Sequence, residues 1–271
     1  MTLQDTVSPD ASARAAGAAS APRFAIVIPM LNEADTVAGL IGECVAAAEG
    51  HGPYEICVTD DGSTDGTGDV LLAMRTAHPG VPITIVTHPR PAGQSAAVHA
   101  AVRAARAPVI ATLDGDGQNP PAEVPKLLAP LIGPDADPAT GLVAGQRVKR
   151  DDPVAKRLAS KAANAIRGWL LKDGTRDTGC GLKAFRREAF LALPYFNHMH
   201  RYLPALFQRD GWAVAHVDVA HRARVAGASK YTNLSRAIVG LTDLIGVAWL
   251  IRRKRAVGRD EVSVSPAGEV H

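Results

Sequence analysis

Two carboxylates separated by one glycine are the pattern in this sequence best suited to chemistry. Asp114 and Asp116 stand in the run Leu113-Asp-Gly-Asp-Gly-Gln118, directly after an apolar stretch. Carboxylate oxygens are hard ligands, and two of them with open positions alongside suit Mg²⁺ or Mn²⁺ bound together with substrate phosphates. The alternative is a polar turn, because Asp and Gly are both common in turns. A position directly after a buried strand favours the metal site.

A second acidic run, Thr59-Asp-Asp-Gly-Ser-Thr-Asp-Gly-Thr67, has two interpretations. Asp60 is placed to accept hydrogen bonds from the base or the ribose of a nucleotide. Ser63, Thr64 and Asp65 are placed to cap a following helix. We expect a nucleotide contact for Asp60 and a capping role for Asp65.

Apolar, β-rich runs alternate with helical stretches through the first half of the chain. This alternation predicts βαβ units, and hence an α/β fold with a mostly parallel, Rossmann-like sheet flanked by helices. Ligands bind outside the carboxyl ends of such strands. The predicted strands cover residues 24–28, 54–59, 83–87, 109–113 and 142–145, and the predicted helices cover 35–49, the stretch from the second acidic run to 78, and 93–106. Acidic clusters follow three of these strands.

Four motifs, taken in order, resemble the signatures of family 2 glycosyltransferases with the GT-A fold. They are Ile26-Val-Ile-Pro-Met-Leu-Asn-Glu33, the acidic run at 59–67, Gly93-Gln-Ser-Ala-Ala97 and Leu113-Asp-Gly-Asp-Gly-Gln-Asn-Pro-Pro121. Three later segments make dolichol- and polyprenol-phosphate mannosyltransferases and their bacterial relatives the nearest likeness within that family. These are Asp177-Thr-Gly-Cys-Gly-Leu-Lys-Ala-Phe-Arg-Arg-Glu188, His200-Arg-Tyr-Leu-Pro204 and His221-Arg-Ala-Arg-Val-Ala-Gly-Ala-Ser-Lys-Tyr231.

The resemblance implies a nucleotide-binding wall formed by the loops after the first two strands. Pro29, Leu31 and Glu33 match the segment that walls the nucleotide, and Asp60 matches the contact to its base or ribose. The family usually has an aromatic residue where Leu31 stands, so this chain departs from the pattern that stacks on the base.

The resemblance also implies a metal and a set of phosphate-binding cations. The metal-binding triplet is matched by Asp114, Asp116 and Gln118, with Asp114 and Asp116 also facing the nucleotide-sugar. The catalytic positions are matched by Asp116, Arg147, Arg224 and Lys230, of which the three basic residues meet donor or acceptor phosphates; Arg222 and Ser229 are weaker matches.

The activity implied by the resemblance is inverting transfer of a hexose, mannose from GDP-mannose, onto polyprenyl or dolichyl phosphate. The alternatives are a UDP-sugar donor, a glycan hydroxyl as acceptor, or an inactive nucleotide-binding scaffold. A sugar hydroxyl needs a general base, whereas a phosphate monoester is already mostly anionic at neutral pH. Asp177 is the best acidic candidate for a base, and it is equally placed to brace Arg147.

Charge and cysteine content narrow the functional classes that fit this sequence. The formal net charge of +3 is too small to indicate nucleic-acid binding. The three cysteines are odd in number and lack metal-ligand spacing, so they predict buried thiols in a reducing compartment.

The expected organisation has two disordered tails around one domain and a C-terminal helix. The tails are residues 1–23 and 256–271, the GT-A domain is 24–235, and 236–255 is a hydrophobic and basic helix. Its apolar part, 237–251, is too short to span a bilayer. This helix and the basic amphipathic stretch 154–171 are either core or surface helices, or helices lying on a membrane. We expect a peripheral protein at the cytoplasmic face, recruited by anionic lipid or by a separate integral membrane partner.

Overall fold

A seven-stranded sheet organises the structure. The computed structural model describes residues 20–148, 167–222 and 233–254. Within these ranges the strand order is β3-β2-β1-β4-β6-β5-β7, and β6 alone runs antiparallel to its neighbours β4 and β5. The strands are β1 (Phe24–Met30), β2 (Tyr54–Asp60), β3 (Ile83–Thr87), β4 (Val109–Thr112), β5 (Thr140–Arg147), β6 (Lys183–Arg186) and β7 (Ala213–Val219).

The five predicted strands are confirmed to within a few residues, because each is an apolar run; four of them lie inside the sheet, and β3 lies at its edge with mostly half-buried side chains. The sequence did not predict β6 or β7. Strand β6 is only four residues long and has a basic residue at each end. Strand β7 lies at an edge and includes the exposed polar residues His216 and Asp218. Neither strand shows the apolar run on which the prediction depended.

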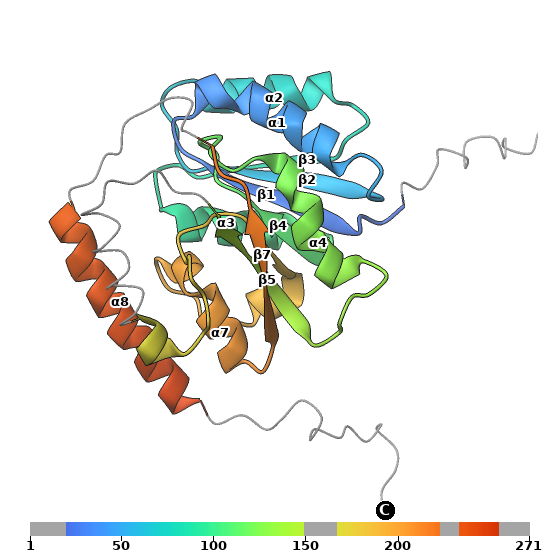
Figure 1. The fold of residues 1–271 in the computed structure, drawn as a ribbon. Coiled ribbons are helices and arrows are strands. Elements are labelled where there is room, and N and C mark those ends of the chain that lie inside the picture. The colour runs from blue at the N-terminus through green and yellow to red at the C-terminus, as the bar shows by residue number, and fades with distance from the viewer. Residues whose placement is uncertain (1–19, 149–166, 223–232, 255–271) are drawn as a thin grey trace, which may run out of the picture.

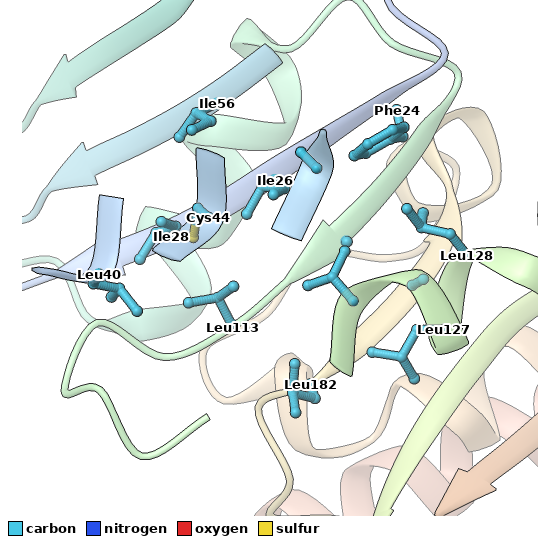
Figure 2. Packing of buried hydrophobic residues seen from close by; sticks show 14 of the residues in the cluster. Phe24, Ile26, Ile28, Leu40, Cys44, Ile56, Leu113, Leu127, Leu128 and Leu182 are labelled. Carbon is cyan, nitrogen blue, oxygen red and sulfur yellow. The ribbon is translucent and has the colours of Figure 1, made fainter. Parts of the chain in front are cut away.

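Helices cover both faces of the sheet (Figure 1). Helices α1 (Ala34–Ala48), α2 (Thr67–Ala77) and α4 (Val124–Ile132) pack on one face. Figure 2 shows that core, where Ile26 and Ile28 of β1 meet Leu40 and Cys44 of α1. The other face packs against α3 (Gln94–Ala104), α6 (Arg187–Leu191), α7 (Leu203–Arg209) and α8 (Asn233–Arg253). Short 3-10 turns, η2 (Pro121–Glu123) and η3 (Met199–Arg201), precede α4 and α7.

A helix is present where the C-terminal helix was predicted. The predicted pair of amphipathic helices, 154–171 and 236–255, is not confirmed. Helix α8 contains the predicted stretch 237–251 and buries Leu244, Val247 and Ala248 against α7 and its neighbours. Of the predicted helix 154–171, the described part is helical over 167–171, and the rest lies outside the described residues. Both predicted tails lie outside them too, apart from residues 20–23.

All three cysteines are free thiols and buried, as expected. Burial raises the pKa of Cys44 and raises the pKa of Cys57 to about 12, so these thiols are protonated at neutral pH. They act as small apolar packing residues.

A buried carboxylate ties the middle of the sheet to the end of α3. Glu55 of β2 is 1% exposed, and its Oε1 accepts the backbone N–H groups of Arg106 and Ala107 at 2.6 and 2.8 Å. These bonds hold the segment between α3 and β4 against β2. They therefore help to set where β4 begins, and with it the position of the acidic run that follows.

The substitution Glu55→Ala should lower the free energy of unfolding by about 1–3 kcal/mol, because two backbone N–H groups lose their acceptor, one of them on the fully buried Ala107. Urea denaturation would measure the change, with Glu49→Ala at an exposed position as the matched control. Equal midpoints for both variants would show that this carboxylate does not hold the segment.

Candidate active site

Most of the predicted site residues lie at one edge of the sheet. Strands β1, β2 and β4 are parallel, with Met30 paired to Asp60, so the loops that follow them emerge together. Strand β5 runs in the same direction and ends at this edge with Arg147. The antiparallel β6 begins there with Lys183, whose partner is Thr112.

Asp114 is the first residue of the acidic loop, and three parts of the chain converge on it. Its Oδ1 accepts a hydrogen bond from Nε2 of Gln94 at 2.7 Å, and its Oδ2 accepts one from Nδ2 of Asn119 at 3.0 Å. A Cβ atom at Gly181 would overlap this carboxylate, so the close approach requires glycine. Burial raises the pKa of Asp114, and the nearby charge of Asp116 raises it further.

The loop from Asp114 to Gln118 is held by backbone contacts on both sides. The hydroxyl of Thr36 donates to the carbonyl of Gly115 at 3.0 Å, and a Cβ atom at Gly115 would lie 2.8 Å from the carbonyl oxygen of Pro29. Asp116 accepts the backbone N–H of Gln118 at 3.1 Å. The loop therefore has little freedom to move its two carboxylates apart.

Arg222, a weaker candidate for phosphate binding, braces this loop. Its Nε donates to the carbonyl of Gly117 at 2.5 Å, and its Nη2 donates to the carboxylate of Glu43 at 2.9 Å. Its backbone N–H donates to the carbonyl of Gln118 at 3.1 Å. The guanidinium connects the acidic loop to α1.

The donor set fits a hard divalent cation that shares its coordination with a substrate. Asp114 and Asp116 supply carboxylate oxygens, and a bound cation would offset the negative charge of the two neighbouring carboxylates. Within the described ranges, no group of three or more His, Cys, Asp or Glu side chains is arranged to hold a metal alone. The remaining positions would thus come from Gln118, water or phosphate oxygens, as Mg²⁺ sites often require.

The loops after β1 and β2 are joined by side-chain hydrogen bonds. Asn32, with a φ of 56°, accepts the backbone N–H of Thr64 at 2.8 Å, while its own N–H donates to the hydroxyl of Ser63 at 2.9 Å. Asp60 accepts the N–H of Ser63 at 2.9 Å and is 5% exposed. The Asp60 carboxylate thus closes its own turn at the place predicted to meet the nucleotide.

Asp65 contacts the first residues of two helices, although the N-cap of α2 is Gly66 rather than the predicted Ser63, Thr64 or Asp65. It accepts the backbone N–H of Thr67 at 3.0 Å and that of Ala34 at 3.1 Å. The hydroxyl of Thr67 in turn accepts the N–H of Glu33 at 2.9 Å. The same segment leaves Leu31 37% exposed, while Pro29 lines a cavity beside the acidic loop.

Sequence reasoning assigned no role to Asp61, which proves to be a brace. It is 3% exposed, and its oxygens accept the backbone N–H groups of Ala92 and Gly93 at 2.9 and 2.8 Å. His88 Nδ1 lies 2.6 Å from the same carboxylate. In the sequence, the only indication of this role was the position of Asp61 beside Asp60. Asp61 fixes the loop that leads into α3 and therefore fixes Gln94.

Asp177 braces Arg147, which was one of its two predicted roles. The guanidinium donates to the carboxylate through Nε at 2.5 Å and Nη2 at 2.8 Å, a bidentate pair that raises the pKa of Arg147. The side-chain oxygen of Gln146 accepts the backbone N–H groups of Arg176 and Asp177, each at 3.0 Å. Arg147 is thereby fixed at the same edge as Asp114. Arg224, Ser229 and Lys230 lie outside the described residues.

A cavity of about 360 Å³ opens beside Asp114. Its lining includes Pro29, Gln94, Asp114, Cys180, Lys183 and His200. Lys183 is 5% exposed and donates to the carbonyl of Cys180, and burial lowers its pKa. Sequence reasoning did not place Lys183 or His200 in the site.

His200 should make stability depend on pH. Burial, with Lys183 and Arg201 nearby, lowers the pKa of His200 to about 3 from the ordinary 6.5. Below pH 6.5 the unfolded chain binds a proton that the folded chain does not, so this contribution is complete above pH 6.5 and is lost as pH falls toward 3.

The substitution His200→Gln should therefore flatten the fall in unfolding free energy between about pH 6.5 and pH 4. Urea denaturation at several pH values would measure it, with His51→Gln at an exposed position as control. If the His200→Gln curve stays parallel to the wild-type curve, the histidine is not held neutral.

The chain matches a known protein family and is similar to two curated relatives. Residues 25–193 match the family described as Glycosyl transferase family 2. The chain is 34% identical over 242 residues to a dodecaprenyl-phosphate galacturonate synthase of Rhizobium johnstonii, covering 87% of this chain and 69% of that protein. It is 33% identical over 210 residues to an undecaprenyl-phosphate 4-deoxy-4-formamido-L-arabinose transferase of Pectobacterium carotovorum, covering 77% of this chain and 62% of that protein.

Solved structures share the fold at lower identity. Glucosyl-3-phosphoglycerate synthase from Mycobacterium tuberculosis, with Mn²⁺, UDP-glucose and phosphoglyceric acid, superposes with a TM-score of 0.64 at 20% identity, covering 85% of this chain and 79% of that one. A mannosyltransferase from Pyrobaculum calidifontis, with GDP-mannose and Mn²⁺, gives 0.62 at 23%, covering 88% and 66%. These likenesses confirm the predicted GT-A fold.

Proposed function

The chain belongs to glycosyl transferase family 2, and on that premise we propose that it transfers a sugar from a nucleotide-sugar donor to a polyprenyl phosphate. The observation that carries the proposal is the acidic loop after β4, held next to Arg147 and Lys183 at the carboxyl edge of the sheet. The relatives named above support the acceptor, since both are polyprenyl-phosphate enzymes by name. The chain spans 69% and 62% of their lengths.

The roles we propose follow the charges at this edge. Asp114 and Asp116, with Gln118, hold Mg²⁺ or Mn²⁺, which supplies Lewis-acid stabilisation of a leaving nucleoside diphosphate when bound. The other roles divide between two sets of residues: Pro29, Leu31, Glu33 and Asp60 wall the nucleotide, whereas Arg147, Arg224 and Lys230 bind phosphate groups.

The reaction we propose is a single displacement at the anomeric carbon. An oxygen of the acceptor phosphate forms the new bond while the bond to the nucleoside diphosphate breaks, which inverts the configuration. A phosphate monoester has a second pKa of about 6, so the attacking oxygen is already anionic at neutral pH. The engagement of Asp177 by Arg147 supports a mechanism without a dedicated base. A glycan hydroxyl as acceptor would need one.

The motif resemblance predicts GDP-mannose as the donor. The two curated relatives are named for galacturonate and for formamido-arabinose, so their names do not support mannose. A screen of purified protein with polyprenyl phosphate and GDP-mannose, UDP-glucose, a UDP-linked uronic acid or a UDP-linked pentose would decide the sugar. Released nucleoside diphosphate is the readout. An inactive scaffold would release none from any donor.

Activity with the selected donor should require Mg²⁺ or Mn²⁺. The substitution Asp116→Ala should lower turnover at least about 100-fold, the scale lost with a key electrostatic group. Asp135→Ala, at an exposed loop position, is the matched control and should keep wild-type turnover. Full activity in excess chelator would contradict the proposed metal role.

We further propose that α8 rests on the membrane that holds the acceptor. In the part of the chain that the structure describes, no helix is long and apolar enough to cross a bilayer. Three apolar side chains spaced four residues apart on α8, Leu241, Ile245 and Trp249, are 58%, 59% and 57% exposed. Arg252 and Arg253 follow and are exposed, with Arg253 stacked over Trp249. An exposed apolar stripe with adjacent cations suits an anionic lipid surface.

The sequence prediction assigned four cations to this contact, residues 252–255. Lys254 instead pairs with the carboxylate of Asp210 at 2.6 Å and is 22% exposed in its side chain. Arg255 lies outside the described residues. Arg252 and Arg253 are therefore the cations we propose for the lipid contact.

The triple substitution of Leu241, Ile245 and Trp249 by Ser should reduce binding to anionic vesicles several-fold, because the apolar insertion is lost. Flotation at low and at physiological salt would measure it, and salt should weaken the wild-type interaction. Leu72→Ser, 47% exposed on α2, is the control and should float like the wild type. Wild-type protein that stays entirely in the soluble fraction at low salt would rule out direct docking.

A further inference from the structure

Lys183 is a buried cation that forms no ion pair with a carboxylate in the described part of the chain, although the charges of Asp114 and Asp177 favour its charged form. Its side chain is almost fully buried, and its one hydrogen bond there goes to the carbonyl of Cys180. No carboxylate in those ranges lies within 4.0 Å of its ammonium group. An ammonium group has three donors, and leaving it buried without compensating partners is unfavourable. The ammonium therefore has donors to spare for a ligand that enters the cavity it lines.

His200 lines the same cavity and presents a second donor. Its backbone N–H lies 3.4 Å from the hydroxyl oxygen of Ser95, and its Nδ1 lies 2.8 Å from that oxygen. The Ser95 hydroxyl can donate to Nδ1 or accept from it, according to the tautomer of the ring. In the tautomer in which Nδ1 accepts the Ser95 hydroxyl, Nε2 carries the proton, and no described side chain is hydrogen-bonded to Nε2.

The N-terminus of helix α3 adds positive potential at the same cavity. Gln94 is its first residue and lines the cavity, and the positive end of a helix dipole favours a nearby anion. The cavity volume of about 360 Å³ is several times the roughly 30 Å³ that a water molecule occupies, so a phosphate group has room there.

We propose that this cavity binds the phosphate monoester of the acceptor, with Lys183 and His200 as ligands to its oxygens. The assignment rests on the proposed transfer to polyprenyl phosphate. The nucleotide loops follow β1 and β2, whereas Lys183 begins β6, on the far side of β4 from them. The cavity extends from Pro29, in β1, past Asp114 to Lys183, so an anion held at Lys183 lies at the β6 end of the cavity, away from the loops after β1 and β2. In-line displacement needs the attacking oxygen and the leaving diphosphate on opposite sides of the anomeric carbon, and this placement of the acceptor phosphate allows that arrangement.

A purely structural role for Lys183 makes a different prediction. Asp114 also lines the cavity, and the charge of Lys183 lowers the pKa of that carboxyl against the effect of burial. If Lys183 served only to balance Asp114, its removal would weaken binding of metal and nucleotide rather than of acceptor. Measuring the two ligands separately distinguishes the two roles.

The test is calorimetric titration of the purified full chain with a short-chain isoprenyl phosphate, in the absence of any sugar donor. Lys183→Met should weaken binding at least about tenfold, the scale of a lost hydrogen bond to a charged group. Binding of GDP or UDP with Mn²⁺ should change less than about twofold. Lys126→Met, at a surface lysine paired with Glu123, is the matched control.

Three further variants separate recognition of the phosphate from effects on folding. His200→Phe removes the ring donor and should weaken isoprenyl phosphate binding several-fold, while His200→Gln restores a side-chain N–H and should recover part of the affinity. If Lys183→Met fails to fold, Lys183→Gln replaces it, because an amide keeps a donor for the Cys180 carbonyl without the charge. Isoprenyl alcohol, which lacks the phosphate, should bind all variants alike.

The results of the titration distinguish failure of the cavity assignment from failure of the proposed activity, which the donor screen tests. Unchanged isoprenyl phosphate affinity in folded Lys183→Met or Lys183→Gln protein overturns the assignment, as does a loss confined to nucleotide binding. If the wild type transfers sugar only to a glycan hydroxyl and does not bind isoprenyl phosphate, both proposals fail. Lysine-dependent binding without transfer from any donor would leave the cavity assignment standing and remove the proposed activity.

Discussion

The structure depends on how the carboxylate of Asp114 is held among groups that favour its ionised form. Asp114 lies at the end of a buried strand, beside a second carboxylate, and burial raises its pKa. Gln94 and Asn119 donate hydrogen bonds to it, and the charges of Lys183 and Arg147 favour its ionised form. These groups come from separate segments of the chain. Placing one charge at this edge thus constrains α3, the loop after β4, β5 and β6 at once.

Much of the fold follows from patterns that are local in sequence. Apolar runs such as Phe24–Met30 and Val109–Thr112 are buried in the sheet, and acidic loops after parallel strands meet at one edge. The part that could not be predicted depends on one reversed strand. Because β6 runs antiparallel, its first residue rather than its last lies at the site. Because the sequence did not predict β6, Lys183 was not placed in the site.

Other site features depend on contacts that no local pattern encodes. Asp61 resembles Asp60 in sequence, yet it accepts N–H groups more than 30 residues away and fixes the start of α3. Arg222 lies in a basic segment that resembles a phosphate site, yet its guanidinium spans the acidic loop and α1. In each case the residue type predicted a charge at the site, and only the tertiary structure showed which group that charge meets.

The position of β6 between β4 and β5 also has a consequence for biosynthesis. Strands β1 to β4 leave the ribosome early and can pair with one another, but β4 gains its second neighbour only when a segment 71 residues beyond Thr112 has been made. Until then a row of backbone N–H and C=O groups along β4 stays open to intermolecular pairing. A nascent or truncated chain that ends before residue 183 is therefore an aggregation hazard, and its fourth strand is the one we expect to need a chaperone.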